Sequence, residues 1–247
     1  MHYKRVLLKL SGEAVAGEQD FGFSSSAIEH IADQVLSLHE AGVEVALVVG
    51  GGNIFRGDLG ARWGIERAEA DNIGMMATVI NSLMLRGVLQ SRGKLGAADV
   101  RVMSAIPMHT VAEPFIRLRA IHHLEKGFIV IFAAGSGNPF VTTDYPAVMR
   151  AIEIRAQAIL FAKNGVDGVY NADPKKDAAA KRYLNVDYNT VIRENLKALD
   201  QSAVILARDH KLPIHVFDFD QSDAALAICR GERVGTFIQE TSDVKLG

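Results

Sequence analysis

The chain has 247 residues, of which 49% are hydrophobic and 23% are charged, and its formal net charge at pH 7 is -2. This length and composition are typical of a globular protein with enough apolar residues for a core, and the chain lacks the basic excess of a general nucleic-acid-binding protein. Cys229 is the single cysteine, so an intrachain disulfide and a cysteine-rich zinc site are excluded, and one thiol fits a reducing compartment.

The N-terminal segment MHYKRVLLKLSGEA has a basic start but only a very short apolar run. It predicts a first strand instead of a signal peptide. No stretch approaches the roughly 20 consecutive apolar residues that a membrane span needs. We therefore expect a cytoplasmic protein with neither a membrane nor a nucleic acid as its partner.

Short runs rich in β-branched residues alternate along the chain with segments of helical period. The predicted strands are residues 5–10, 43–49, 100–104, 128–133, 158–161 and 214–217. The predicted helices are one that Ser26 caps and Gly42 ends, then residues 71–90, 116–125, 145–155 and 201–210. Several strands are apolar on both faces, which is typical of a parallel sheet covered on both sides. The pattern predicts β-α-β units with right-handed crossovers and an α/β fold around an open sheet.

Three of the predicted strands end in glycine or other small residues. These ends are residues 9–12 (KLSG), 50–57 (GGGNIFRG) and 135–144 (GSGNPFVTTD). Glycine lets backbone N–H groups approach an anion closely, and a helix N-terminus adds a favourable dipole. One such loop is explained equally well by a tight turn. Three of them at the carboxyl ends of strands in one sheet favour a basin for several phosphates.

None of these loops matches a familiar phosphate-binding motif. Residues 52–57 have the Walker spacing, but Asp58 occupies the position that needs lysine. The run that begins at Gly135 starts like a dinucleotide-binding fingerprint, but Phe140 stands where the third glycine belongs. A P-loop kinase and a Rossmann dehydrogenase are therefore both disfavoured.

Charged residues next to the loops are candidates for phosphate chemistry. Lys9 ends a buried-type strand, although the pleat could still point it to solvent, and Arg56 follows the triple glycine. Phosphoryl transfer asks mainly for positioning and charge neutralisation, which such cations supply. Asp71, Asp144 and Asp200 each stand at a predicted helix start, where capping the helix is the simpler interpretation. None of the eight histidines has a metal-site or relay spacing, so we expect no metal ligated by the protein alone.

Five segments resemble the motifs of bacterial UMP kinases, in order and over essentially the whole chain. They are KLSGEA (9–14), GGGNIFRG (50–57), SGNPFVTTD (136–144), DGVYNADPKKD (167–177) and LARDHKLPI (206–214). KLSG and the ADP segment alone are typical of the broader amino acid kinase superfamily. The resemblance implies a three-layer α/β/α sandwich with a mainly parallel open central sheet. It also implies a single domain, 1–247, with a UMP-side lobe at about 1–157 and an ATP-side lobe at about 158–247, separated near the irregular stretch 164–182.

The resemblance also implies site residues. The implied ATP contacts are Lys9, Leu10, Ser11, Gly12, Gly52, Arg56, Asn164, Tyr170 and Asp173. The implied UMP contacts are Gly51, Asp71, Ser136, Gly137, Asn138, Pro139, Phe140, Val141, Thr142 and Thr143. The implied catalytic residues are Lys9 and Arg56 for transition-state charge, with Asp144 and Asp200 organising those cations or the magnesium shell. Lys163 competes with Asn164 for the ATP-side contact, because the segment AKNGVDG leaves both positions open.

The activity implied by the resemblance is direct in-line transfer of the γ-phosphoryl group of Mg·ATP to UMP, in pyrimidine nucleotide biosynthesis. A phosphate monoester is already largely ionised near neutral pH, so no general base is required. A homohexamer, inhibition by UTP and activation by GTP are further implications. The closest alternative is a superfamily member that phosphorylates a carboxylate or carbamate, against which GNPFVTTD and Asp71 argue. A non-catalytic nucleotide-binding protein is the other, against which Lys9 and Arg56 argue.

Overall fold

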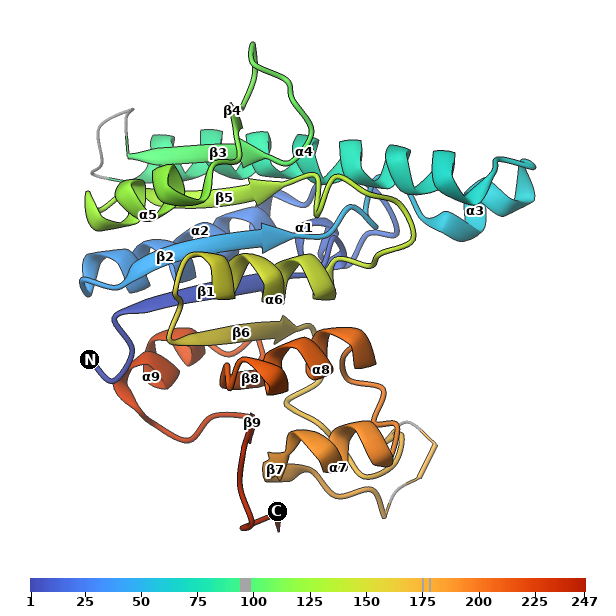
Figure 1. The fold of residues 1–247 in the computed structure, drawn as a ribbon, viewed down its shortest axis with the longest axis vertical. Coiled ribbons are helices and arrows are strands. Elements are labelled where there is room, and N and C mark those ends of the chain that lie inside the picture. The colour runs from blue at the N-terminus through green and yellow to red at the C-terminus, as the bar shows by residue number, and fades with distance from the viewer. Residues whose placement is uncertain (94–98, 175, 178) are drawn as a thin grey trace.

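The computed structural model describes residues 1–93, 99–174, 176–177 and 179–247, and these build one mixed ten-stranded sheet (Figure 1). The strand order is β10-β7-β9-β8-β6-β1-β2-β5-β3-β4. The strands are β1 Arg5–Leu10, β2 Glu44–Val49, β3 Val100–Ser104, β4 Glu113–Pro114, β5 Ile129–Ala133, β6 Ala158–Lys163, β7 Tyr183–Asp187, β8 Ile214–Asp218, β9 Thr236–Gln239 and β10 Lys245–Leu246. Neighbouring strands run parallel except β8 with β9 and β10 with β7.

The helices described are α1 Glu13–Ala16, α2 Ser25–Glu40, α3 Gly57–Arg62, α4 Arg67–Arg92, α5 Arg117–Glu125, α6 Asp144–Glu153, α7 Tyr188–Arg193, α8 Gln201–Asp209 and α9 Ala224–Arg230. Helices α2, α4 and α9 cover one face of the sheet, and α5, α6, α7 and α8 cover the other (Figure 1). The predicted three-layer α/β/α sandwich around a mainly parallel sheet is therefore confirmed.

Alternation along β1 explains how one strand serves both core layers. Val6, Leu8 and Leu10 pack with the helices on the first face, and Leu7 packs with those on the second. Lys9 falls on the same face as Leu7, because successive side chains of a strand point to opposite faces. This places the ammonium group under α6 at the carboxyl end of the strand.

All six predicted strands are present, with ends that shift by at most two residues. β4, β7, β9 and β10 were not predicted. β4 and β10 have two residues each, which is too short for a hydrophobic period to appear. β7 directly follows the irregular stretch 164–182. Lys175 and Ala178 of that stretch lie outside the described residues.

Two helix starts differ from the predictions by more than one residue. The N-cap of α2 is Ser24, whose hydroxyl accepts a hydrogen bond from Ala27 N at 3.4 Å, so the prediction of Ser26 as the cap is wrong. Ser24 is the last residue with extended backbone, and Ser26 is already helical. Helix α4 begins at Arg67 instead of residue 71. The prediction missed this start because the N-cap, Glu66, makes no side-chain capping bond and is not a typical capping residue.

Helix α4 is the one described helix whose length and apolar composition would suit a membrane span. Polar residues such as Asn72 and Asn81 interrupt its apolar run, so the expectation that no stretch approaches about 20 consecutive apolar residues stands. In the fold, α4 lies along one face of the sheet, and its buried residues include Met75, Val79, Leu85 and Leu89. Its apolar character belongs to a core helix.

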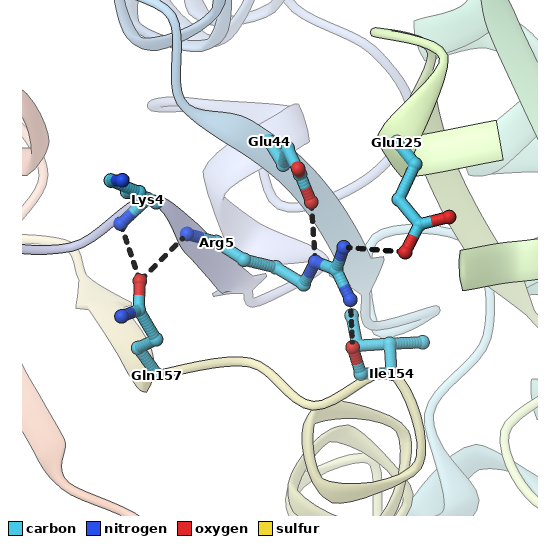
Figure 2. Close-up of polar contacts among 6 residues, drawn as sticks. All are labelled: Lys4, Arg5, Glu44, Glu125, Ile154 and Gln157. Carbon is cyan, nitrogen blue, oxygen red and sulfur yellow. Dashed lines mark hydrogen bonds and ion pairs between the residues drawn. The ribbon is translucent and has the colours of Figure 1, made fainter. Parts of the chain in front are cut away.

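A polar cluster ties together the amino ends of the central strands (Figure 2). The guanidinium of Arg5 on β1 pairs with Glu44 on β2, donates to Ile154 O at 2.7 Å and lies 3.8 Å from Glu125. Gln157 Oε1 accepts from Arg5 N at 3.1 Å, just before β6. The cluster thus joins β1 and β2 to the ends of α5 and α6. It lies at the amino ends of the strands, opposite the carboxyl ends that carry the glycine loops.

Candidate active site

The first two glycine loops touch one another at the carboxyl ends of β1 and β2. Gly50 N donates to Leu10 O at 3.0 Å. A Cβ added at Gly12 would lie 2.5 Å from Gly52 N, so only glycine fits there. A Cβ at Gly51 would lie 2.7 Å from Gly74 O of α4. The loops therefore need glycine for close approach, and their backbones are fixed against each other and against α4.

The second and third loops enclose a cavity of about 360 Å³ together with α4. Of the residues predicted to contact UMP, those in its wall are Gly51, Asp71, Ser136, Asn138, Val141, Thr142 and Thr143. Gly137, Pro139 and Phe140 belong to the same loop but are not in the wall. Most of the predicted UMP contacts thus lie in the wall of one cavity, which Gly52, a predicted ATP contact, also lines.

Lys9 lies beside this cavity and is paired with Asp144. Lys9 Nζ is 2.6 Å from Asp144 Oδ1, and both side chains are largely buried. In the sheet, Lys9 is in register with Val48, which lines the cavity. Burial acts to raise the pKa of Asp144, but the charge and hydrogen bond of Lys9, with the charge of Lys163, outweigh burial, so the pKa is lowered. A carboxylate thus faces two cations at this point.

Lys163 ends β6 next to this pair. Burial lowers its pKa, and Asp144 and Asp200 act in the opposite direction while Lys9 adds to the lowering. Asn164, one residue further, donates instead to Asp220 Oδ1 at 3.5 Å. Lys163 therefore lies within the electrostatic reach of Lys9 and Asp144, whereas the side chain of Asn164 turns to the loop after β8.

Neither Asp144 nor Asp200 makes the side-chain capping bond of the simpler interpretation, although Asp200 occupies the N-cap position of α8. Asp144 opens α6 but its carboxylate bonds Lys9, and its Oδ2 accepts from Asp200 N at 3.3 Å. Asp200 stands at the N-cap of α8 without a side-chain capping bond, and it accepts the hydroxyl of Thr142. These contacts join the third glycine loop to α8. Asp71 is not a cap either, since it lies in the second turn of α4.

Asp71 holds the tip of the third loop. Its Oδ2 accepts from Phe140 N at 2.8 Å, and its Oδ1 lies 2.9 Å from Arg67 Nε. Phe140 has a positive φ of 67° and an exposed ring. For a bulky residue this backbone conformation is strained, and the bond to Asp71 helps to maintain it.

Arg56 folds back onto the second loop. Its Nε donates to Gly52 O at 3.1 Å, and its Nη2 lies 3.3 Å from Glu13 Oε1 of α1. The guanidinium is about half exposed and therefore free to exchange these contacts for phosphate oxygens. Lys9 lies near the end of β1 and Arg56 follows the loop after β2, and these two chain segments touch through Gly12 and Gly52; their action as two cations of one site stays a prediction.

The remaining predicted ATP contacts lie after β6. Tyr170 donates to Asp167 Oδ1 at 2.6 Å, and Asp173 lies 3.7 Å from Lys176. Neither residue is in the wall of the cavity. Both follow Lys163, the last residue of β6, by at most ten positions in the chain, and their contact with ATP stays a prediction.

Sequence reasoning missed one wall of the cavity. Arg67, Gly74, Met75 and Thr78 line it together with Asp71, all on α4. Met75 and Thr78 are also buried, and their helical spacing in the sequence is equally typical of a core face. The signal was available, because positions 71, 74, 75 and 78 fall on one side of a helix that already carries a candidate ligand contact.

Known proteins match this chain over nearly its full length. A model of the amino acid kinase family matches residues 4–218. The uridylate kinase of Frankia alni is 57% identical over 239 residues, which are 97% of this chain and 92% of its own length. The uridylate kinase of Limosilactobacillus reuteri is 47% identical over 96% of this chain and 97% of its own length.

Solved structures give the same result. The structure of UMP kinase from Bacillus anthracis has a TM-score of 0.96 and 55% identity, with both chains covered completely. That of UMP kinase from Ureaplasma parvum has a TM-score of 0.89 and 32% identity over 97% of this chain and 100% of that one. The resemblance to UMP kinases is thereby confirmed, and the chain belongs to the amino acid kinase family.

Proposed function

We propose that this protein transfers the γ-phosphoryl group of ATP to UMP, giving ADP and UDP, as a step of pyrimidine nucleotide biosynthesis. The observation that carries the proposal is the Lys9–Asp144 ion pair beside a cavity walled by two glycine loops. The uridylate kinases among the relatives, at 47% to 57% identity, support UMP as the acceptor.

In the proposed reaction, an oxygen of the UMP phosphate attacks the γ-phosphorus of ATP in line. The new P–O bond forms as the bond from the γ-phosphorus to the bridging oxygen breaks, and ADP leaves with that electron pair. Lys9 and Arg56 neutralise the charge on the transferring group, and the N–H groups of loops 9–12 and 50–53 orient the ATP phosphates. No side chain has to remove a proton from UMP, because its phosphate is ionised.

The acceptor and donor sides divide as the resemblance implies. We assign UMP to the cavity, with Asp71 accepting bonds from the ribose hydroxyls, and the nucleoside of ATP to Asn164, Tyr170 and Asp173 beyond β6. In this arrangement residues 1–157 form the UMP-side lobe and 158–247 the ATP-side lobe of one domain. The sheet supports a single domain, because β6 and β8 continue it directly from β1.

Kinase activity with ATP requires a divalent cation, and we propose Mg²⁺. The described part of the chain holds no group of three His, Cys, Asp or Glu side chains placed to bind a metal ion. Mg²⁺ usually keeps several waters and takes one or two carboxylates with substrate phosphates. Asp144 and Asp200 are adjacent and fit that limited role. The cation would neutralise charge on the phosphates.

We further propose a cytoplasmic homohexamer that UTP inhibits and GTP activates. An apolar patch on α4 supports contact between subunits. It is formed by Ile80, Leu83, Met84, Gly87 and Val88, and Ile80 is 47% exposed. Contiguous exposed apolar patches on proteins often mark sites of contact with another protein.

The test is ADP release by the purified protein with Mg·ATP and one acceptor at a time: UMP, CMP, dUMP, AMP, glutamate, aspartate, acetylglutamate or carbamate. We expect release with UMP and equimolar UDP, and none after chelation of the cation. Release with a carboxylate or carbamate would keep the family and change the substrate. Binding of ATP without acceptor-dependent release, with and without GTP, would leave a nucleotide-binding protein and contradict the proposal.

A further inference from the structure

Two buried polar side chains of α4 reach the glycine loops on either side of the cavity. Thr78 bonds the third loop, and Asn81 bonds the second. The two residues are three positions apart, so they project from the same side of the helix. One helix face thus makes direct contact with both loops.

Thr78 holds the start of the third loop. Its hydroxyl accepts from Ala134 N at 2.8 Å and donates to Met75 O at 2.7 Å, so both of its hydrogen-bonding functions are used. Ala134 is fully buried and has a φ of 62°, a left-handed conformation that is uncommon for any residue but glycine. This conformation turns the chain out of β5 into the loop, and the Thr78 hydroxyl satisfies the N–H group that the turn removes from the sheet.

Asn81 holds the second loop through a reciprocal amide pair. Asn81 Nδ2 donates to Asn53 Oδ1 at 2.7 Å and to Gly50 O at 2.7 Å, and Asn53 Nδ2 donates to Asn81 Oδ1 at 3.0 Å and to Gly22 O at 2.9 Å. Both side chains are fully buried. All four amide N–H bonds are therefore made, as a buried polar network requires if it is to specify one geometry.

The second loop packs so closely against α4 that a side chain at Gly51 has no room. A Cβ at Gly51 would meet both Gly74 O and Ala77 Cβ of α4 within 2.8 Å. The backbone at Gly51 is thus pressed against the turn of α4 that precedes Thr78, and the carbonyl of Gly50 is bonded by Asn81 in the turn that follows Thr78. Helix α4 sets the position of each loop and hence the distance between them.

We infer that Thr78 and Asn81 are positioning residues that fix the phosphate-binding loop 50–57 and the acceptor loop 134–143 relative to each other. The inference rests on the proposed function for its kinetic consequence. In-line transfer depends on the separation and alignment of the two reacting groups, and a misplacement of about 1 Å can lower the rate about 100-fold. Loops held by one rigid helix meet that requirement before either substrate binds.

The test compares Thr78→Val, Thr78→Ser and Ser82→Ala. Valine keeps the shape of threonine and removes the hydroxyl, whereas serine keeps the hydroxyl. Ser82 is a matched control, because it is fully buried on α4 and its hydroxyl donates to Thr78 O at 2.7 Å without bonding either loop. Asn81→Ala forms a second arm for loop 50–57. Hydrogen–deuterium exchange of the free protein measures each loop directly.

We expect Thr78→Val to increase exchange in residues 134–143 and not in 50–57, and Asn81→Ala to do the reverse. In steady-state kinetics, Thr78→Val should raise KM for UMP about 10-fold and lower kcat about 10- to 100-fold, with KM for ATP nearly unchanged. Thr78→Ser should restore both measurements, and Ser82→Ala should resemble the wild type.

Three results separate the inference from its alternatives. Wild-type loop exchange in folded Thr78→Val, or a uniform rise across the chain that Ser82→Ala reproduces, overturns it. Failure of Thr78→Ser to restore the loop also overturns it. If the wild-type protein releases no ADP with UMP, the proposed function fails, and the exchange data still decide whether α4 positions the loops. If Asn81→Ala does not fold, the Thr78 series carries the decision alone.

Discussion

Lys9 Nζ and Asp144 Oδ1 lie 2.6 Å apart and tie the carboxyl end of β1 to the first turn of α6. Only 11% and 14% of the two side chains are exposed. Because the pKa of Asp144 is lowered, its carboxylate is ionised at neutral pH. Its stabilising effect is present above the ordinary carboxyl pKa and is lost as the pH falls through the lowered value. The pair therefore holds a cation beside the cavity under the conditions in which a kinase would work.

Replacing Lys9 by methionine should lower kcat about 10²- to 10³-fold, because one group that neutralises transition-state charge is lost. It should also lower the free energy of unfolding by about 3–5 kcal/mol, since Asp144 is left buried without its main partner. The double variant Lys9→Met with Asp144→Asn should recover much of that stability but none of the turnover.

UMP-dependent ADP release and urea unfolding at pH 7 check these expectations. Near-normal turnover in folded Lys9→Met would remove Lys9 from the mechanism. Equal stability of the single and double variants would mean that the unpaired buried charge of Asp144 is not the cause of the stability loss in Lys9→Met.

Much of the fold could be predicted because the central strands are buried on both faces and are therefore apolar throughout. The missing strands lie in the outer parts of the sheet, beyond β8 on one side and β3 on the other, where pairing is decided by partners elsewhere in the chain. β9, for example, pairs with β8 and β7, and the four residues of β9 show no period long enough to predict it. Tertiary contacts, and not local propensity, create these elements.

The candidate site could be predicted in part for a similar reason. Lys9, Arg56 and the three loops are signalled locally by glycine and by position after a strand. The partners of Asp144 and Asp200 are not: Lys9 is 135 positions from Asp144, and Thr142 is 58 positions from Asp200. Capping was the best local interpretation of both carboxylates, and only the fold supplies the contacts that replace it.

Replacing Asp71 by asparagine should raise KM for UMP about 10- to 100-fold, because a charged acceptor of hydrogen bonds is lost. KM for ATP should change little. The preference for UMP over dUMP should also fall, because the hydrogen bonds proposed from the ribose hydroxyls to this carboxylate are weakened. Glu69→Gln is a matched control, since Glu69 is an exposed acid of the same helix outside the cavity wall.

Steady-state kinetics with UMP and dUMP measure the effect. An equal rise in KM for ATP would place Asp71 on the donor side instead. An unchanged KM for UMP would limit Asp71 to its bond with Phe140 N.

Acid should destabilise the protein partly through His215. Burial, with a smaller effect of His2, lowers the pKa of His215 to about 3, whereas an unfolded histidine titrates near 6.5. Above pH 6.5 both states are neutral and His215 adds no pH dependence. Below it the unfolded state binds a proton that the folded state refuses, so stability falls by roughly 2 kcal/mol between pH 6.5 and pH 5.

Urea unfolding at pH 7 and pH 5 tests this for wild type, His215→Gln and His122→Gln. The decrease should be smaller by roughly 2 kcal/mol in His215→Gln. His122 is exposed on α5 and serves as the control. The same decrease in all three proteins would assign the acid sensitivity to other groups.

Replacing Arg5 by methionine should destabilise the fold and leave the reaction unchanged. The guanidinium, whose side chain is 13% exposed, links Glu44, Glu125 and the carbonyl of Ile154 at the edge of the sheet away from the cavity (Figure 2). Methionine keeps the length of the side chain but leaves a buried carbonyl without its donor, which costs about 1–3 kcal/mol. Arg5→Lys should recover only part of this, because one ammonium cannot reach three acceptors in the geometry of a planar fork.

Urea unfolding measures the loss of stability in Arg5→Met. The value of kcat/KM for UMP, measured well below the unfolding transition, should stay within about twofold of wild type, since distant sites act independently. A large fall in kcat/KM of the folded variant would show that the two edges of the sheet are coupled.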